Sequence, residues 1–293
     1  MTPELKQLAA DVDAALDGFL PAEDAFPAEI HRAVRYSVFA GGKRLRPLLT
    51  LAAAEIFGVP QLQAMPAACA LEMIHTYSLI HDDLPALDDD DYRRGRLANH
   101  KVFGDALAIL AGDSLLTLAF ETLAAEASAY FNAATVVRLV EELGRAAGMQ
   151  GMIGGQVVDL LSEGKQVNAE ILDYIHRHKT GKLFICCIRS GAVMGDASPE
   201  ELTRLTSFAE KIGLAFQIVD DILDITGDET VLGKKTGSDE SKQKLTYPAL
   251  YGLAKAQEKA DSLYLSALHE IEPFGQSAGK LRQLAEMLVH RNK

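Results

Sequence analysis

The sequence is poor in cysteine, has no surplus of positive charge and shows almost no pattern typical of β-strands. Its three cysteines, Cys69, Cys186 and Cys187, form no paired framework and no CxxC motif, which argues against a disulfide-stapled fold and a zinc site. Buried thiols in a reducing cytosol are expected instead. The net charge of −12 argues against a nucleic-acid partner, because no basic excess can displace phosphate counterions.

The sequence also shows no feature typical of a targeting or membrane-spanning segment. Residues 1–10 lack a basic stretch followed by an apolar one, so no signal peptide is expected. The longest apolar stretch, residues 106–120, is interrupted by Asp113 and is too short for a bilayer core of about 30 Å, so no membrane insertion is expected. The sequence therefore predicts a soluble, cytoplasmic protein.

Helical periodicity and helical stop signals run through all 293 residues, of which 48% are hydrophobic. No linker rich in proline or serine divides the chain, so one all-α domain over residues 1–293 is predicted. Ser198 to Glu201 form a capping box that opens a long helix. Helices are expected over residues 2–20, 27–40, 47–58, 61–83, 105–127, 133–147, 169–193, 199–226, 247–270 and 276–291.

Two aspartate clusters lie more than a hundred residues apart, and each follows an apolar helical run. The first contains Asp82, Asp83 and Asp88, and the second contains Asp220, Asp221 and Asp224. Dense carboxylates beside apolar helix are costly to bury unless cations compensate them. A solvated acidic surface is the plain alternative. If the clusters face each other, their all-oxygen donor set favours magnesium, and no EF-hand spacing suggests calcium.

Basic residues beside the clusters indicate an anionic ligand. Lys43 and Arg46 lie near the start of a helix, where backbone N–H groups also attract anions. Others follow the clusters directly, namely Arg93, Arg94, Lys234 and Lys244. No P-loop, Ser-His-Asp elbow or HExxH motif is present. These features predict chemistry in which a metal-bound diphosphate is the leaving group.

Five motifs in a fixed order carry a family resemblance. They are Gly41-Gly42-Lys43-Arg44-Leu45-Arg46-Pro47, Asp82-Asp83-x4-Asp88 with Arg93-Arg94-Gly95, Gly154-Gly155-Gln156-x2-Asp159, Lys179-Thr180 and Asp220-Asp221-x2-Asp224. Over nearly its whole length the chain resembles the trans-isoprenyl diphosphate synthases, above all the bacterial farnesyl-forming members. The resemblance implies an isoprenoid-synthase-type bundle of mostly antiparallel helices around a deep central cavity. It also implies a homodimer and three Mg²⁺ ions, for which Mn²⁺ can substitute.

The resemblance also implies roles for particular residues. The metal ligands would be Asp82, Asp83, Asp88, Asp220 and Asp224. The allylic diphosphate would contact Arg93, Lys179, Thr180, Gln217, Lys234 and Lys244, and isopentenyl diphosphate would contact Lys43, Arg46, His75 and Arg94. The catalytic set would be Asp82, Asp83, Asp88, Lys179, Thr180, Gln217, Asp220, Asp221 and Asp224.

The product length follows from the residues before the first cluster. Tyr77 and Ser78 occupy the fifth and fourth positions before Asp82, and a tyrosine there would close the cavity to a longer tail. An aromatic residue at this position is similar to what the farnesyl-forming members of the family carry, so the resemblance implies head-to-tail condensation to a fifteen-carbon product, (E,E)-farnesyl diphosphate. A geranyl or geranylgeranyl diphosphate synthase, a terpene cyclase and a non-catalytic regulatory subunit stay open as alternatives.

Overall fold

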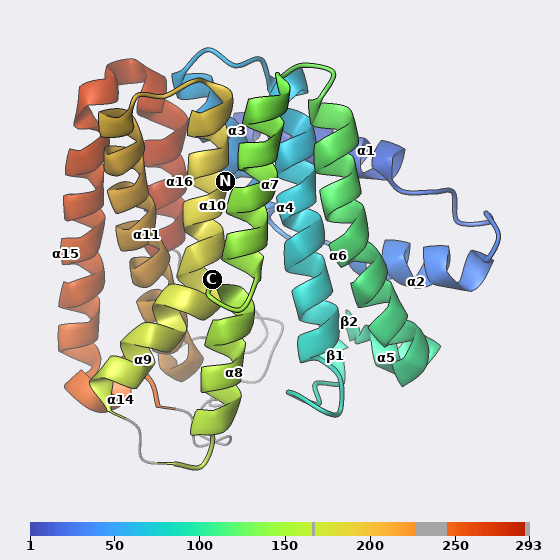
Figure 1. Cartoon of the computed structure of the whole chain (residues 1–293). Coiled ribbons are helices and arrows are strands. Elements are labelled where there is room, and N and C mark those ends of the chain that lie inside the picture. Colours follow the sequence, from blue (N-terminus) through green and yellow to red (C-terminus); the bar gives the residue numbers. More distant parts are fainter. Residues whose placement is uncertain (166–167, 227–244, 291–293) are drawn as a thin grey trace. The chain divides into compact units, whose positions relative to one another are not determined.

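The computed structural model describes residues 1–165, 168–226 and 245–290, and these residues are almost entirely helical (Figure 1). The α-helices are α1 Pro3–Phe19, α2 Ala28–Val38, α3 Leu45–Ile56, α4 Gln61–Asp82, α5 Asn99–Phe103, α6 Asp105–Ala127, α7 Ala133–Ala147, α8 Met152–Ser162, α9 Ala169–Ile175, α10 Lys182–Met194, α11 Pro199–Thr226, α14 Tyr247–Tyr251, α15 Leu253–Ile271 and α16 Gly279–Val289. A π-helix, η1 His176–Gly181, and a 3₁₀ segment, η2 Glu272–Ala278, complete them. The prediction of an all-α fold is confirmed.

The chain forms two compact units. Unit 1 comprises Met1–Leu48 and Leu62–Val140, and unit 2 comprises Leu49–Gln61 and Glu141–Lys293. The division falls inside α3 and α7 and after the first residue of α4. The expectation of a single domain over the whole chain stays a prediction.

Unit 1 is built on α4 and α6. The side chains of Met73 and Thr122 meet between these helices, 3.9 Å apart, and α2 and α5 pack on α6. A hairpin follows the first aspartate cluster, with β1 Tyr92–Arg93 paired antiparallel to β2 Arg96–Leu97. Arg94 and Gly95 form its two-residue turn with φ of 54° and 75°, the left-handed values that a type I′ turn requires. The hairpin pairs Arg93 with Arg96 across its two strands.

Unit 2 is built on α11, which packs along α15 and α10 (Figure 1). The capping box predicted at its start is confirmed. The Ser198 N–H donates to Glu201 Oε2 at 2.7 Å, and the Glu201 N–H donates to Ser198 Oγ at 3.3 Å. Buried side chains along the helix, such as Leu205 and Phe208, fix which face turns inward. The second aspartate cluster lies near its other end.

The secondary structure departs from expectation in two interrupted helices and in three elements that were not predicted. The helix predicted over 169–193 is interrupted by the π-helix η1, and the one predicted over 247–270 is broken at Gly252, whose φ is 84°. Helices α5 and α8 were not predicted, and neither was the hairpin. Glycine-rich sequence around residues 148–155 hid α8, because glycine is a poor helix former.

The length argument against membrane insertion was wrong for one helix. Helix α6 has 23 residues and contains an 18-residue stretch with a mean hydropathy of 1.5, so it is long and apolar enough to cross a membrane. Only 39% of this stretch is buried. Core helices of soluble proteins pass the same test, so one such helix among the described residues is weak evidence. The absence of membrane insertion stays a prediction.

Candidate active site

The first aspartate cluster is held by a compact turn at the end of α4. Asp82 is the last residue of the helix, and the Asp88 N–H donates to the Asp82 carbonyl at 2.8 Å. A second bond, from the Asp89 N–H to the Leu84 carbonyl at 3.2 Å, tightens the same turn. Carboxylates at the C-terminal end of a helix oppose its dipole and destabilise the fold. Their presence here therefore favours a functional role.

Asp83 is engaged in an ion pair with Arg93 of the hairpin. It is only 2% exposed and accepts from Arg93 Nε at 2.9 Å, while Arg93 Nη2 donates to the same carboxylate. Burial raises the pKa of Asp83, and the guanidinium opposes that rise. Because the pair is mutual, Asp83 fixes Arg93 beside the cluster. Its predicted role as a metal ligand stays a prediction.

Cationic side chains gather around His75 on α4. Burial and nearby guanidinium groups hold the pKa of His75 well below its usual range, so the imidazole is neutral. These groups belong to Arg46, Arg94, Arg93 and Arg44. Three of the residues predicted to bind isopentenyl diphosphate, Arg46, His75 and Arg94, are thus brought together, while Lys43 is exposed on the adjoining loop. Concentrated positive charge beside a neutral imidazole is suited to a diphosphate.

The glycine pair before Lys43 is needed for this arrangement. Arg94 donates to the Gly41 carbonyl, and a Cβ on Gly42 would lie 2.7 Å from the guanidinium carbon of Arg94. Both glycines also have positive φ, 96° and 124°. Gly42 therefore leaves room for the Arg94 guanidinium, and Gly41 supplies a backbone conformation that other residues seldom adopt.

Tyr77 is buried on α4, between His75 and Asp82 in sequence. It is 4% exposed, its ring stands edge-on to His81, and its hydroxyl has no hydrogen-bond partner among the described residues. Burial, with a contribution from Asp82, raises its pKa to about 12. His81 Nε2 donates to the Ile109 carbonyl of α6, 3.0 Å away. The Ser78 hydroxyl donates to the His75 carbonyl at 2.9 Å.

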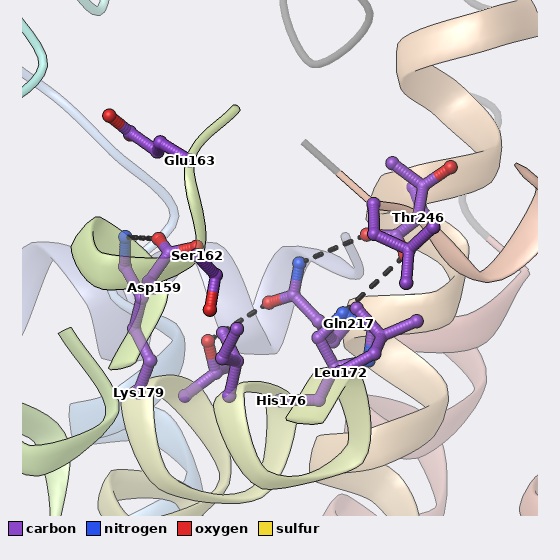
Figure 2. A pocket seen from close by; sticks show the side chains of 12 residues that line it. Asp159, Ser162, Glu163, Leu172, His176, Lys179, Gln217 and Thr246 are labelled. Atoms are coloured by element: carbon purple, nitrogen blue, oxygen red, sulfur yellow. Dashed lines mark hydrogen bonds and ion pairs between the residues drawn. The ribbon is translucent and has the colours of Figure 1, made fainter. Parts of the chain in front are cut away.

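A pocket of about 150 Å³ lies within unit 2 (Figure 2). It brings together four predicted site residues, Lys179, Thr180, Gln217 and Asp221. The remaining lining residues are Asp159, Ser162, Glu163, Leu172, Ile175, His176, Leu245 and Thr246. Asp220 and Asp224 do not line it. Both lie on α11, where Asp220 is half-buried and Asp224 is buried.

A chain of hydrogen bonds orients the polar groups of this pocket (Figure 2). The Thr180 hydroxyl donates to Gln217 Oε1 at 2.9 Å, and Gln217 Nε2 donates to Asp221 Oδ1 at 3.3 Å. The other oxygen of Asp221 accepts from the Tyr247 N–H at 2.8 Å and lies 3.5 Å from His176 Nε2. Asp221 therefore acts as a junction that fixes which way the Gln217 amide points.

Sequence reasoning missed two residues of this pocket. Asp159 accepts from Lys179 Nζ at 2.7 Å, and His176 is 5% exposed with no partner at Nδ1 among the described residues. Asp159 ends the motif Gly154-Gly155-Gln156-x2-Asp159, but no role was predicted for it. His176 lies one turn before Lys179, and that spacing was the available signal. The π-helix, a feature frequent at functional sites, positions both His176 and Lys179.

No group of three metal-binding side chains is preassembled among the residues that the structure describes. Magnesium does not need one, because it usually binds one or two carboxylates together with water and substrate phosphate oxygens. The exclusively carboxylate donors of Asp82, Asp88, Asp220 and Asp224 fit that chemistry. The expectation that the two clusters face each other stays a prediction. Lys234 and Lys244 lie outside the described residues.

Comparison with known proteins decides the family. The polyprenyl synthetase family pattern matches residues 27–287. The chain belongs to the polyprenyl synthetase family. It is 46% identical to the farnesyl diphosphate synthase of Geobacillus stearothermophilus, over 96% of this chain and 94% of that one. It is 49% identical to the heterodimeric geranylgeranyl pyrophosphate synthase large subunit 1 of Arabidopsis thaliana, over 96% and 76%.

The fold agrees with that assignment. A crystal structure of an FPP/GFPP synthase from Zymomonas mobilis matches with a TM-score of 0.88 at 38% identity, covering 98% of this chain and 97% of that one. The predicted isoprenoid-synthase-type fold is confirmed. The predicted prenyltransferase activity is confirmed as that of this polyprenyl synthetase, whose relatives include both farnesyl and geranylgeranyl synthases.

Gly155 of this polyprenyl synthetase is predicted to be irreplaceable. A Cβ at this position on α8 would overlap the backbone nitrogen of Lys179 in η1. Backbone cannot move aside as a flexible side chain can, so Gly155→Ala should lower the free energy of unfolding by about 3 kcal/mol. Urea unfolding measures this change. Gly279→Ala is the control, because no atom of the described residues lies within 4 Å of a Cβ there.

Acid should destabilise the protein through His176. Burial lowers the pKa of His176 to about 4 in the folded chain, whereas an unfolded histidine titrates near 6.5. The unfolded state alone gains the proton between these values, so stability should fall by about 3 kcal/mol as the pH drops from 6.5 to 4. Urea unfolding across this range measures the fall. His176→Gln should make the pH dependence shallower, and an unchanged slope would contradict the assignment.

Proposed function

We propose that this polyprenyl synthetase is a (2E,6E)-farnesyl diphosphate synthase (geranyltranstransferase). It would condense isopentenyl diphosphate head-to-tail with dimethylallyl or geranyl diphosphate and release pyrophosphate. The observation that carries the proposal is the basic cluster near His75, in which Arg94 donates to the Gly41 carbonyl of the loop that leads to Lys43 and Arg46. This cluster provides a diphosphate site made of cations, in addition to the carboxylate clusters that suit a metal-bound diphosphate. An enzyme that joins two diphosphate substrates needs both.

Each site residue has a proposed role. Arg46, His75, Arg94 and Lys43 hold isopentenyl diphosphate, and Arg93, Lys179, Lys234 and Lys244 hold the allylic diphosphate. Asp82, Asp88, Asp220 and Asp224 hold Mg²⁺, which when bound supplies Lewis-acid stabilisation of the departing pyrophosphate. Asp83 is better suited to holding Arg93, since the buried Asp83 carboxylate already forms an ion pair with the partly exposed guanidinium.

The reaction breaks the C1–O bond of the allylic diphosphate, and the bonding electrons leave with pyrophosphate. The isopentenyl double bond then attacks the allylic carbon, and the released pyrophosphate is proposed to take the proton that restores a double bond. The Gln217 amide oxygen is directed by Thr180, and such a dipole stabilises positive charge.

The proposal extends to the whole protein. Both compact units would form one synthase domain, since the family match runs through both. A cytoplasmic homodimer without nucleic-acid or membrane partners is proposed with it, on the resemblance to the family and on the acidic charge. A fifteen-carbon product is proposed from Tyr77, whose buried ring lies on the helix that leads to Asp82.

One assay tests the function. Purified protein is incubated with labelled isopentenyl diphosphate and either dimethylallyl or geranyl diphosphate, with and without Mg²⁺, and the products are sized by chromatography. We expect farnesyl chains from both starters, and none without metal. A twenty-carbon product would favour the second candidate, a geranylgeranyl diphosphate synthase, to which the 49% identity with the Arabidopsis protein points. A cyclic hydrocarbon would indicate a terpene cyclase instead.

A further inference from the structure

Arg44 is a buried arginine that the proposed reaction does not use. It lies between Lys43 and Arg46 in sequence, yet it is 3% exposed. Its guanidinium donates to Asp13 Oδ1 at 2.6 Å, to Glu72 Oε1 at 2.8 Å and to the Val38 carbonyl at 2.7 Å. These three acceptors come from α1, from the last residue of α2 and from α4. One side chain thus ties the loop before α3 to three helices of unit 1.

The backbone of Arg44 is fixed as firmly as its side chain. Its φ is 50°, a left-handed value that non-glycine residues seldom adopt and that the surrounding contacts must maintain. Its carbonyl accepts from the Leu48 N–H at 3.0 Å and so begins the hydrogen bonding of α3. Lys43 immediately precedes this residue, and Arg46 lies in the first turn that follows it. The directions of both side chains therefore depend on how Arg44 is held.

Glu72, which pairs with Arg44, connects this arginine to the helix that carries His75. Glu72 is 1% exposed and lies three residues before His75 on α4, so the two share a side of the helix. The pairing of Arg44 with Glu72 fixes the Lys43–Arg46 loop against the helix that carries His75. A buried ion pair seldom adds much net stability, and its best-attested use is to specify one arrangement.

We infer that Arg44 and Glu72 are positioning residues for isopentenyl diphosphate, which hold Lys43 and Arg46 in register with His75. This inference rests on the proposed function. Arg44 itself need not touch the substrate, because its guanidinium donors are directed at Asp13, Glu72 and Val38. Binding of isopentenyl diphosphate should therefore depend on the planar, forked arrangement of the Arg44 guanidinium donors as well as on the charge of Arg44.

Arg44→Lys tests this dependence, because it keeps the charge and loses the fork. We expect the KM for isopentenyl diphosphate to rise tenfold or more, because small displacements of positioning groups have large kinetic effects. The KM for geranyl diphosphate and kcat should change less than threefold. A purely structural role would lower the thermal midpoint and leave both KM values unchanged, which would overturn the inference.

A second variant keeps the test valid if Arg44→Lys does not fold. Replacing Arg44 and Glu72 together by Met and Leu removes both buried charges, a change that other proteins tolerate. It should show the same selective rise in KM. Arg35→Lys is the matched control, because Arg35 pairs with the exposed Asp17 in the same unit. It should leave both KM values unchanged.

Calorimetry with isopentenyl diphosphate, without metal or second substrate, separates this inference from the proposed function. The wild-type protein should bind it, and Arg44→Lys should bind at least tenfold more weakly. Equal affinities, or no binding by the wild-type protein, would overturn the inference. The proposed function would be contradicted if the wild-type protein bound isopentenyl diphosphate but made no prenyl product. In that case the comparison of binding affinities would still decide the role of Arg44.

Discussion

Asp82→Asn and Asp220→Asn are each expected to lower kcat by about a factor of 10³. Each change removes a negative oxygen from the proposed magnesium ligands while preserving the shape of the side chain. The neutral amide binds a hard cation weakly, so less charge on the departing pyrophosphate is compensated. Steady-state assays across a Mg²⁺ titration should show the lower kcat and a higher half-saturating metal concentration.

The fold should survive these changes. Asp82 is the last residue of α4, where its charge is unfavourable, so its replacement should leave the thermal midpoint unchanged or higher. Asp220 lies more than one turn before the end of α11, so its replacement should change the thermal midpoint little. Asp91→Asn is the matched control, since Asp91 is an exposed member of the same acidic run and pairs with Lys101 at 2.6 Å. It should retain activity within a factor of two. A loss of less than tenfold in Asp82→Asn at saturating metal would remove that residue from the ligand set.

Most helices could be predicted because their signals are local. The periodicity and cap of α11, from Pro199 to Thr226, and the extent of α6, from Asp105 to Ala127, agree with the predicted ranges. Signals fail where tertiary contacts override propensity. Gly155 weakens α8 as an isolated helix, yet the close approach of Lys179 requires it. The π-helix between α9 and α10 has no sequence signal that periodicity can detect.

In the candidate site, too, some features could be predicted from the sequence and others could not. Residue types and their order identified the carboxylates and cations, because magnesium and diphosphate need those groups whatever the fold. Pairing could not be predicted, since Asp83 and Asp88 look alike in sequence. Only the hairpin turn at Arg94 directs Arg93 towards Asp83. Arg44 likewise appeared to be one basic residue among several, and only its burial with Glu72 distinguishes it.

Tyr77→Ala is expected to lengthen the product beyond fifteen carbons. The ring is buried on α4, and removing it leaves an apolar cavity that a longer prenyl tail can occupy. The variant should also lose about 3–5 kcal/mol of stability, as large-to-small core substitutions do. Chromatography of its products should show chains of twenty carbons or more in place of farnesyl. A thermal melt run alongside establishes that the variant is folded under the assay conditions.

Tyr77→Phe separates the ring from the hydroxyl. The hydroxyl has no hydrogen-bond partner among the described residues, so its removal should leave stability unchanged or raise it by about 1 kcal/mol. The ring still fills the same space, and the product should stay at fifteen carbons. If Tyr77→Ala made only farnesyl chains, the ring would not limit chain growth. If Tyr77→Phe made longer chains, the hydroxyl would have to limit growth through a polar contact, contrary to a steric limit set by the ring.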